Sequence, residues 1–115
     1  MKKKLTIPER ISQEEKRLKE SYNALADDKM NVVDGLIRRA SYMRVALEDY
    51  EEDLVLNGSI EPFTQSEKTE PYDRERPVIR LYNAMNKNYQ SIIKQLSDLL
   101  PKLEKKIEGD GFDEL

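Results

Sequence analysis

The sequence predicts an all-α fold: a long antiparallel helical hairpin with a shorter N-terminal helix packed on it. Two stretches, at about 28–57 and 76–100, carry apolar side chains at steps of three and four residues, which is the spacing of one helix face. Helix-forming residues dominate, and the 115 residues include only four glycines and five prolines. We therefore expect a single helical domain over residues 1–107 and a flexible acidic tail over 108–115.

The first helix is expected to run from Ile7 to Ala26. Pro8 suits the first turn of a helix, because the N–H that proline lacks has no partner there, and Thr6 can serve as the N-cap. A start at Ser12 is the alternative, since Glu15 would then complete a capping box. The apolar face is narrow, which indicates a peripheral helix. That face consists of Ile11, Leu18, Tyr22 and Leu25.

The second helix is expected to begin at Asp27 or Asp28 and to end at Asn57. Gly58 can then adopt the left-handed conformation that ends many helices. Gly35 inside the helix costs about 1 kcal/mol relative to alanine, and a glycine at such a place often lets another helix approach. The predicted apolar stripe comprises Met30, Val33, Leu36, Ile37, Ala40, Met43, Ala46 or Leu47, Tyr50 and Leu54.

Residues 59–75 are predicted to form an irregular linker between the two long helices. They contain two prolines and five acidic residues and show little periodicity. Two aromatic residues that follow prolines, Phe63 and Tyr72, are candidates to anchor this linker on the helices.

The third helix is bounded by Pro77 and Pro101 and carries one wide apolar stripe. It would be roughly 35 Å long, so it needs a partner from this chain or from another copy. A stripe of aromatic residues and methionine at this spacing is more often core than an exposed surface for stacking bases. The residues expected in the core or in an oligomer interface are Leu81, Tyr82, Met85, Tyr89, Ile92, Ile93, Leu96 and Leu99.

Composition excludes several classes of chemistry. The chain contains no cysteine and no histidine, which excludes thiolate nucleophiles, disulfides, imidazole bases and zinc sites with nitrogen or sulfur ligands. No phosphate-binding loop and no nucleophile with its base is recognisable, so we expect no enzyme, no cofactor, no metal and no small-molecule substrate. No apolar run has the length of a membrane span and no signal core follows the basic N-terminus, so we expect an intracellular protein without membrane contact.

Two charged groups invite a functional interpretation. The acidic cluster Glu48, Asp49, Glu51, Glu52 and Asp53 could hold a divalent metal, but its members spread around a helix, so a solvated face is favoured. The candidate DNA contacts are Lys2, Lys3, Lys4, Arg38, Arg39 and Arg44. The three arginines have acidic residues one or two turns away, which favours surface salt bridges. With a net charge of −3, any DNA binding is expected to be weak and electrostatic.

Several segments, in a fixed order, carry a resemblance to a known family. They are L-I-R-R-A-S-Y-M-R-V-A-L-E-D-Y-E-E-D-L, then N-G, then R-E-R-P-V-I-R-L-Y-N-A-M-N-K-N-Y-Q-S-I-I-K-Q-L-S-D-L-L-P, and an acidic D-G-F-D-E-L end. This order resembles small proteins of phages and prophages of Gram-positive bacteria that are similar to terminase small subunits. The match covers Leu36 to Leu115 and is sharpest from Arg76 to Pro101.

The resemblance implies a non-catalytic DNA-packaging protein in the host cytoplasm. Such proteins form a homo-oligomer through the helical hairpin, bind double-stranded DNA and recruit the terminase large subunit, which holds the ATPase and nuclease activities. Many members bind DNA with an N-terminal helix-turn-helix, whereas residues 1–30 here predict one amphipathic helix and no recognition helix behind a turn. The alternative is a small phage-encoded helical adaptor or inhibitor that binds a host or defence protein.

Overall fold

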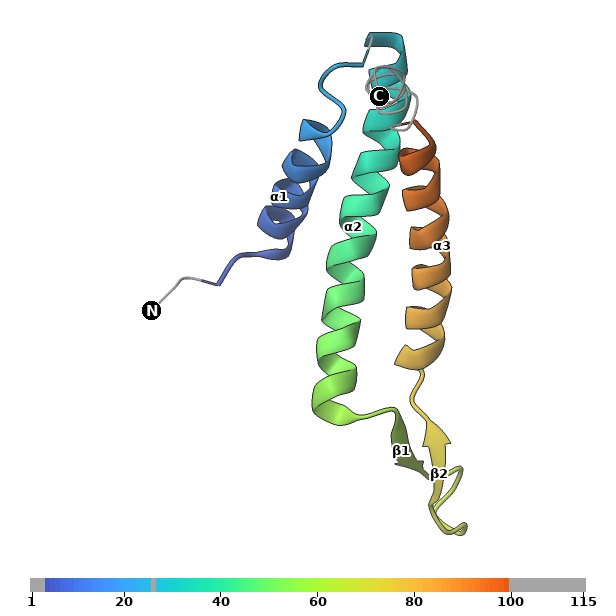
Figure 1. Ribbon diagram of the computed structural model, residues 1–115. Coiled ribbons are helices and arrows are strands. Elements are labelled where there is room, and N and C mark those ends of the chain that lie inside the picture. The colour runs from blue at the N-terminus through green and yellow to red at the C-terminus, as the bar shows by residue number, and fades with distance from the viewer. Residues whose placement is uncertain (1–3, 26, 100–115) are drawn as a thin grey trace, which may run out of the picture.

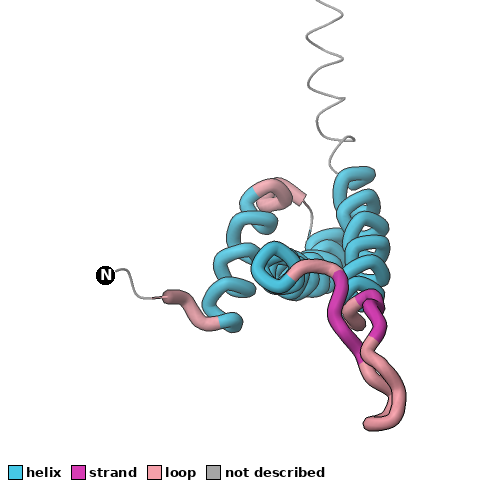
Figure 2. Tube along the Cα trace, turned by 90° about the horizontal axis from the view of Figure 1, so that it is seen from below, coloured by secondary structure: helices cyan, strands magenta, loops and turns pink. Residues whose placement is uncertain are grey.

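The computed structural model describes residues 4–25 and 27–99. Within them the order of elements is α1 (Ile7–Glu20), α2 (Asp27–Asn57), β1 (Ile60–Phe63), β2 (Tyr72–Glu75) and α3 (Val78–Leu99). The central helix is α2, with α1 along one side and α3 antiparallel along the other (Figure 1, Figure 2). The predicted helical hairpin with an N-terminal helix packed on it is therefore confirmed. Lys2, Lys3, Pro101 and the expected tail at 108–115 lie outside the described residues.

The start of α1 is set by a capping box. The side chain of Thr6 accepts a hydrogen bond from the amide of Glu9, and the Glu9 carboxylate accepts one from the amide of Thr6, both at 3.2 Å. Pro8 lies in the first turn, as expected. The alternative start at Ser12 is therefore wrong.

The end of α1 differs from the prediction. The helix stops at Glu20 rather than Ala26, and the amides of Ser21 and Tyr22 bond to carbonyls three residues back, at 3.1 and 3.0 Å. Hydrogen bonds between residues three apart are those of a 3₁₀ turn, which is narrower than an α-helix, so the α-helix ends here. Tyr22 follows this turn into the core, where it is 3% exposed and its hydroxyl donates to the carbonyl of Leu96 at 2.7 Å. One tyrosine thus anchors a segment whose narrow stripe indicated only peripheral packing.

The bounds of α2 agree with the prediction. Gly58 follows it with a φ of 77°, and its amide bonds to the carbonyl of Leu54 at 2.8 Å. The expected close approach at Gly35 is wrong, because a Cβ built there would meet nothing within 4 Å. Of the predicted apolar stripe of α2, the buried residues are Val33, Ile37, Ala40 and Leu47. Ser41 and Val45, which the predicted stripe did not include, are buried as well.

Residues 59–75 form a β-hairpin instead of an irregular linker. Glu61 lies opposite Arg74 in the register, and Phe63 lies opposite Tyr72 with the ring centroids 5.8 Å apart, edge to face. The Arg74 guanidinium also lies 3.8 Å from the centroid of the Phe63 ring. These contacts hold the two strands together, so Phe63 and Tyr72 serve the hairpin and not its attachment to the helices. Cross-strand pairs leave no periodicity within a four-residue strand, which is why the sequence pattern missed them.

The core lies where all three helices meet. We call this part the three-helix half; it comprises α1, the segment of α2 up to Asp49 that α1 covers, and the α3 residues packed against them. The opposite part is the hairpin end: residues 51–63 and 72–81, beyond the reach of α1 (Figure 1). The core side chains come from α2, α3 and the turn that follows α1: Tyr22, Val33, Ile37, Ala40, Ile92 and Leu96. Tyr89, Ile93 and Leu99 of the predicted α3 stripe pack against this core while partly buried.

Candidate functional site

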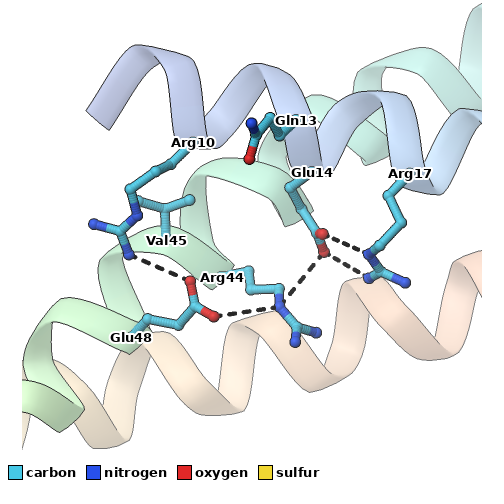
Figure 3. Close-up of a pocket in the computed structure, with 7 residues that line it drawn as sticks. All are labelled: Arg10, Gln13, Glu14, Arg17, Arg44, Val45 and Glu48. Atoms are coloured by element: carbon cyan, nitrogen blue, oxygen red, sulfur yellow. Dashed lines mark hydrogen bonds and ion pairs between the residues drawn. The ribbon is translucent and has the colours of Figure 1, made fainter. Parts of the chain in front are cut away.

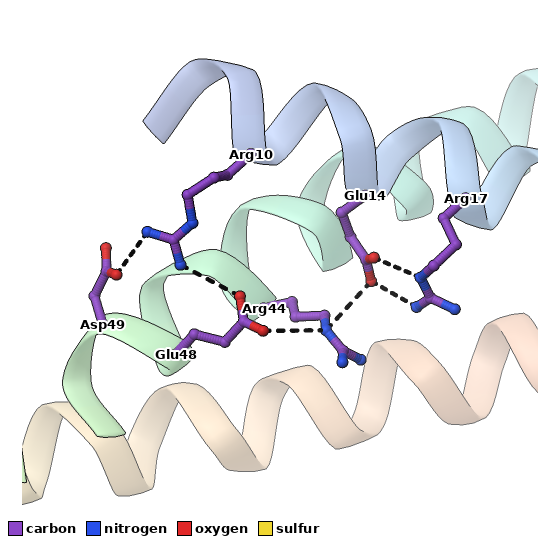
Figure 4. A network of polar contacts seen from close by, with 6 residues as sticks. All are labelled: Arg10, Glu14, Arg17, Arg44, Glu48 and Asp49. Atoms are coloured by element: carbon purple, nitrogen blue, oxygen red, sulfur yellow. Dashed lines mark hydrogen bonds and ion pairs between the residues drawn. The ribbon is translucent and has the colours of Figure 1, made fainter. Parts of the chain in front are cut away.

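Charged side chains fill the interface between α1 and α2, with Glu14 at its centre (Figure 4). The Glu14 carboxylate accepts two hydrogen bonds from Arg17, at 2.6 and 2.7 Å, and forms an ion pair with Arg44 at 3.6 Å. Arg44 also pairs with Glu48, at 3.8 Å. The side chain of Glu14 is only 10% exposed, and a carboxylate buried to that degree is costly unless cations pair with it. Arg44 therefore helps to hold α1 on α2.

Two more ion-pair groups extend this contact along α1. Arg10 donates to Asp49 at 2.7 Å and to Glu48 at 3.3 Å, and its hydrogen bond to the Asp49 carboxylate is the main reason why the pKa of Arg10 is raised. Near the other end of α1, Lys19 pairs with Asp34 at 3.1 Å. Ion pairs thus run along the contact between α1 and α2, and Leu18 of α1 packs against the apolar core that contains Tyr22.

A cavity of about 460 Å³ opens between α1 and α2 (Figure 3). Both carboxylates in its wall are already bound, Glu14 by Arg17 and Glu48 by Arg10. This lining is an ion-pair network that joins two helices. Its residues are Arg10, Gln13, Glu14, Arg17, Arg44, Val45 and Glu48.

The structure does not gather the predicted DNA contacts at one place. Arg44 belongs to the network with Glu14, and Arg38 pairs with Asp34 at 3.2 Å. Arg39 is exposed on α2, and Lys4 is exposed before the start of α1. The favoured alternative of salt-bridged arginines therefore holds for Arg38 and Arg44.

The acidic cluster at the end of α2 has several separate partners. Besides the pairs of Glu48 and Asp49 with Arg10, the Glu51 carboxylate accepts a hydrogen bond from the Tyr82 hydroxyl at 2.9 Å. Among residues 4–25 and 27–99, no group of three acidic side chains is arranged to hold a metal ion. These carboxylates serve contacts between elements, which their position along one helix did not reveal.

Arg76 joins the ends of the two long helices, a role that the sequence analysis missed. It donates to both carboxylate oxygens of Asp53, at 2.9 and 3.0 Å, and to the carbonyl of Gly58 at 2.8 Å. Hydrogen bonds from Asn57 first, and from Arg76 second, lower the pKa of Asp53. Asp53 and Arg76 are 23 residues apart, so no local spacing could have indicated the pair.

Four large apolar side chains in the hairpin end are exposed. Leu81, predicted for the core or an oligomer interface, is 56% exposed and lies outside the core. Val55 and Leu56 in the last turn of α2 are 85% and 73% exposed, and Ile60 at the start of β1 is 59% exposed. We call these four residues the hairpin-end apolar patch. Exposed apolar side chains at one end of a molecule are candidates for an interaction site.

The chain matches no protein-family model, and neither a curated protein nor a solved structure matches it significantly. No helix in the described part of the chain combines the length and the apolar character that crossing a membrane requires.

Proposed function

We propose that this protein is a non-catalytic DNA-packaging subunit of the terminase small-subunit kind. In this proposal it assembles into a homo-oligomer in the host cytoplasm, binds double-stranded DNA weakly, and recruits a large subunit that holds the ATPase and nuclease activities. The observation that carries the proposal is the hairpin-end apolar patch, which lies on a helical hairpin whose sequence resembles that family.

The apolar patch supports self-assembly on energetic grounds. Complete burial of one leucine, isoleucine or valine side chain contributes about 1.5–3 kcal/mol, and the patch offers four such side chains. Each copy carries a net charge of −3, so electrostatic repulsion opposes association. Contact between apolar surfaces of two copies is the interaction that can overcome this repulsion.

Arg76 and the β-hairpin support the same role, because they give the patch a defined shape. The bonds from Arg76 to Asp53 and to Gly58 fix the end of α2 relative to the start of α3. The patch residues sit on both sides of this junction, so they are held in place before any partner arrives. A preorganised surface loses less entropy when it binds.

Deletion of the gene from its phage tests the proposed function. A packaging subunit should be required for filling capsids, so the deletion should yield empty capsids and unpackaged DNA, while host lysis proceeds. Supplying the wild-type chain from a plasmid should restore filled capsids. DNA-filled capsids from the deletion phage would contradict the proposal, and would favour the adaptor or inhibitor that binds a host protein.

A further inference from the structure

The charges of this acidic protein are unevenly distributed between its two long helices. The segment 27–57 that forms α2 contains eight acidic residues and four basic ones, whereas α3 contains three basic residues and the single acid Asp98. The cations of α3 are Arg80, Lys87 and Lys94. A net charge of −3 for the whole chain therefore conceals one helix with a positive balance.

These three cations lie in line along one face of α3. They are seven residues apart, close to two helical turns, so each lies about 10.5 Å beyond the one before it. All three are exposed, and the buried residues Ile92 and Leu96 occupy the opposite side of the helix. Since Ile92 and Leu96 pack into the core with α2, the three cations lie on the face of α3 that is turned away from α2.

The cations of this strip differ from most of the arginines elsewhere in the described part of the molecule. In the described residues no ion pair is formed by Arg80, Lys87 or Lys94, although Asp98 lies one turn beyond Lys94 on the same face of α3. By contrast, ion pairs engage Arg10, Arg17, Arg38, Arg44, Arg74 and Arg76. At the first member of the strip, Arg80 lines a cavity of about 350 Å³ together with Arg74, Glu75, Arg76 and Pro77.

We infer that this face of α3, the basic strip of Arg80, Lys87 and Lys94, contacts the sugar-phosphate backbone of duplex DNA. The inference rests on the proposed function and assigns its DNA contact to α3 instead of the arginines of α2. Duplex DNA carries one negative charge per about 1.7 Å of its axis. The distance of roughly 21 Å from Arg80 to Lys94 would follow about six base pairs.

The side chains between the cations favour DNA over an acidic protein as the partner. Asn83, Gln90 and Ser91 are exposed on this side of α3 and can donate hydrogen bonds to phosphate oxygens. A protein interface usually has buried aromatic or aliphatic residues at its centre. The strip offers only the small residue Ala84, so its chemistry is that of a phosphate contact without sequence readout.

A charge-matched pair of variants tests the inference. R80Q/K87Q/K94Q removes the strip, while K16Q/K29Q/R39Q removes three exposed cations from α1 and α2 and changes the net charge equally. Glutamine preserves helix propensity. Binding of a fluorescent 30-base-pair duplex would be measured by anisotropy over a salt series. The strip variant should lose roughly tenfold or more in affinity. Its negative slope of log K against log salt should become shallower by about 2.7, since each of the three lost phosphate contacts contributes about −0.9 to the slope.

The control variant should keep the affinity and salt slope of the wild type within error. Equal losses in both variants, or an unchanged slope in the strip variant, would overturn the inference. Absence of duplex binding by the wild type at 50 mM salt would also overturn it, and would point to an acidic protein as the occupant of the strip. The proposed function is judged separately by capsid filling, so the two can fail independently.

Discussion

The three-helix half and the hairpin end are built on the same two long helices, yet they bury the apolar side chains of these helices to different extents. In the three-helix half Ile37 and Leu96 are 0% and 2% exposed, whereas at the hairpin end Leu81 is 56% and Val55 85% exposed. The apolar spacing of α3 continues through both parts without interruption. The two parts also differ in what packs on them, since α1 contacts α2 only as far as Asp49 and Tyr22, in the turn after α1, enters the core. A regular apolar stripe thus predicts which residues can be buried, but not which of them other elements cover.

The hairpin end holds its shape by polar and cross-strand contacts in place of a core. Arg76 binds Asp53 and Gly58, and the ring of Phe63 contacts both Tyr72 and Arg74. Such contacts leave the neighbouring apolar side chains free to meet another molecule. We therefore assign folding stability mainly to the three-helix half, and we propose the hairpin end as the place of assembly.

The largest expected effect is that of Leu96→Asp in the three-helix half. An unpaired charge in the core should lower the free energy of unfolding by about 3 kcal/mol or more. The matched variant Leu81→Asp at the hairpin end should change the unfolding free energy of the single chain by less than about 0.5 kcal/mol. Urea unfolding followed by circular dichroism measures both values. Similar losses in the two variants would remove the distinction between the two regions.

The next effect concerns the hydroxyl of Tyr22. Tyr22→Phe removes its hydrogen bond to the carbonyl of Leu96 and should cost about 1 kcal/mol. Burial raises the pKa of this hydroxyl, as expected for a group enclosed by the core. Tyr42→Phe is the control, because Tyr42 is 55% exposed, and urea unfolding should show no change for it. A Tyr22→Phe protein as stable as the wild type would show that the turn after α1 is not held by this bond.

An effect of opposite sign is expected at Gly35. Gly35→Ala should stabilise the protein by about 0.5–1 kcal/mol, because alanine favours the helix and its Cβ meets nothing within 4 Å. Thermal unfolding followed by circular dichroism would show the increase. The same variant should leave the assembly mass unchanged, since the outer face of α2 lies away from the hairpin-end apolar patch. A smaller assembly would reveal that another copy packs closely against Gly35.

The smallest expected effect is the pH dependence of the Asp53–Arg76 contact. The pKa of Asp53 is lowered in the folded protein, so the ionised carboxylate stabilises the fold above its unfolded pKa of about 3.9, and this contribution disappears as the pH falls through the folded pKa. The melting temperature of Asp53→Asn should therefore lie below that of the wild type at pH 7. The gap should narrow below about pH 4. A gap that stays constant down to pH 2 would contradict a role for this charge, and Glu52→Gln serves as the neighbouring control.

Sequence patterns predicted the parts of the fold that depend on neighbours along the chain. The end of α2 at Gly58 and the capping of α1 at Thr6 follow from a few adjacent residues. The ion pair of Arg38 with Asp34 could be read from its spacing of four residues. The β-hairpin and the core position of Tyr22 depend on residues far apart in sequence, and local patterns could not indicate them.

The candidate surfaces were predicted less completely than the fold. The spacing of Leu81 and Leu96 on one stripe is the same whether or not α1 reaches them, so the sequence could not separate interface from core. Arg44 was predicted as a DNA contact, but its pairing with Glu14 from another helix depends on the packing of α1. The seven-residue spacing of Arg80, Lys87 and Lys94 is present in the sequence. The structure adds that all three are exposed on one helix that has a single acidic residue, which makes them a candidate contact surface.

The most direct test of the account is the mass of the protein in solution, measured by size-exclusion chromatography with light scattering. We predict that the wild type forms an assembly of several subunits. Leu56→Asp/Leu81→Asp should reduce it to a monomer with unchanged helicity, and the control Val32→Asp, at an exposed site of the three-helix half, should keep the full mass. A wild type that remains monomeric at high concentration would contradict assembly through the hairpin end, as would a double variant that keeps the wild-type mass.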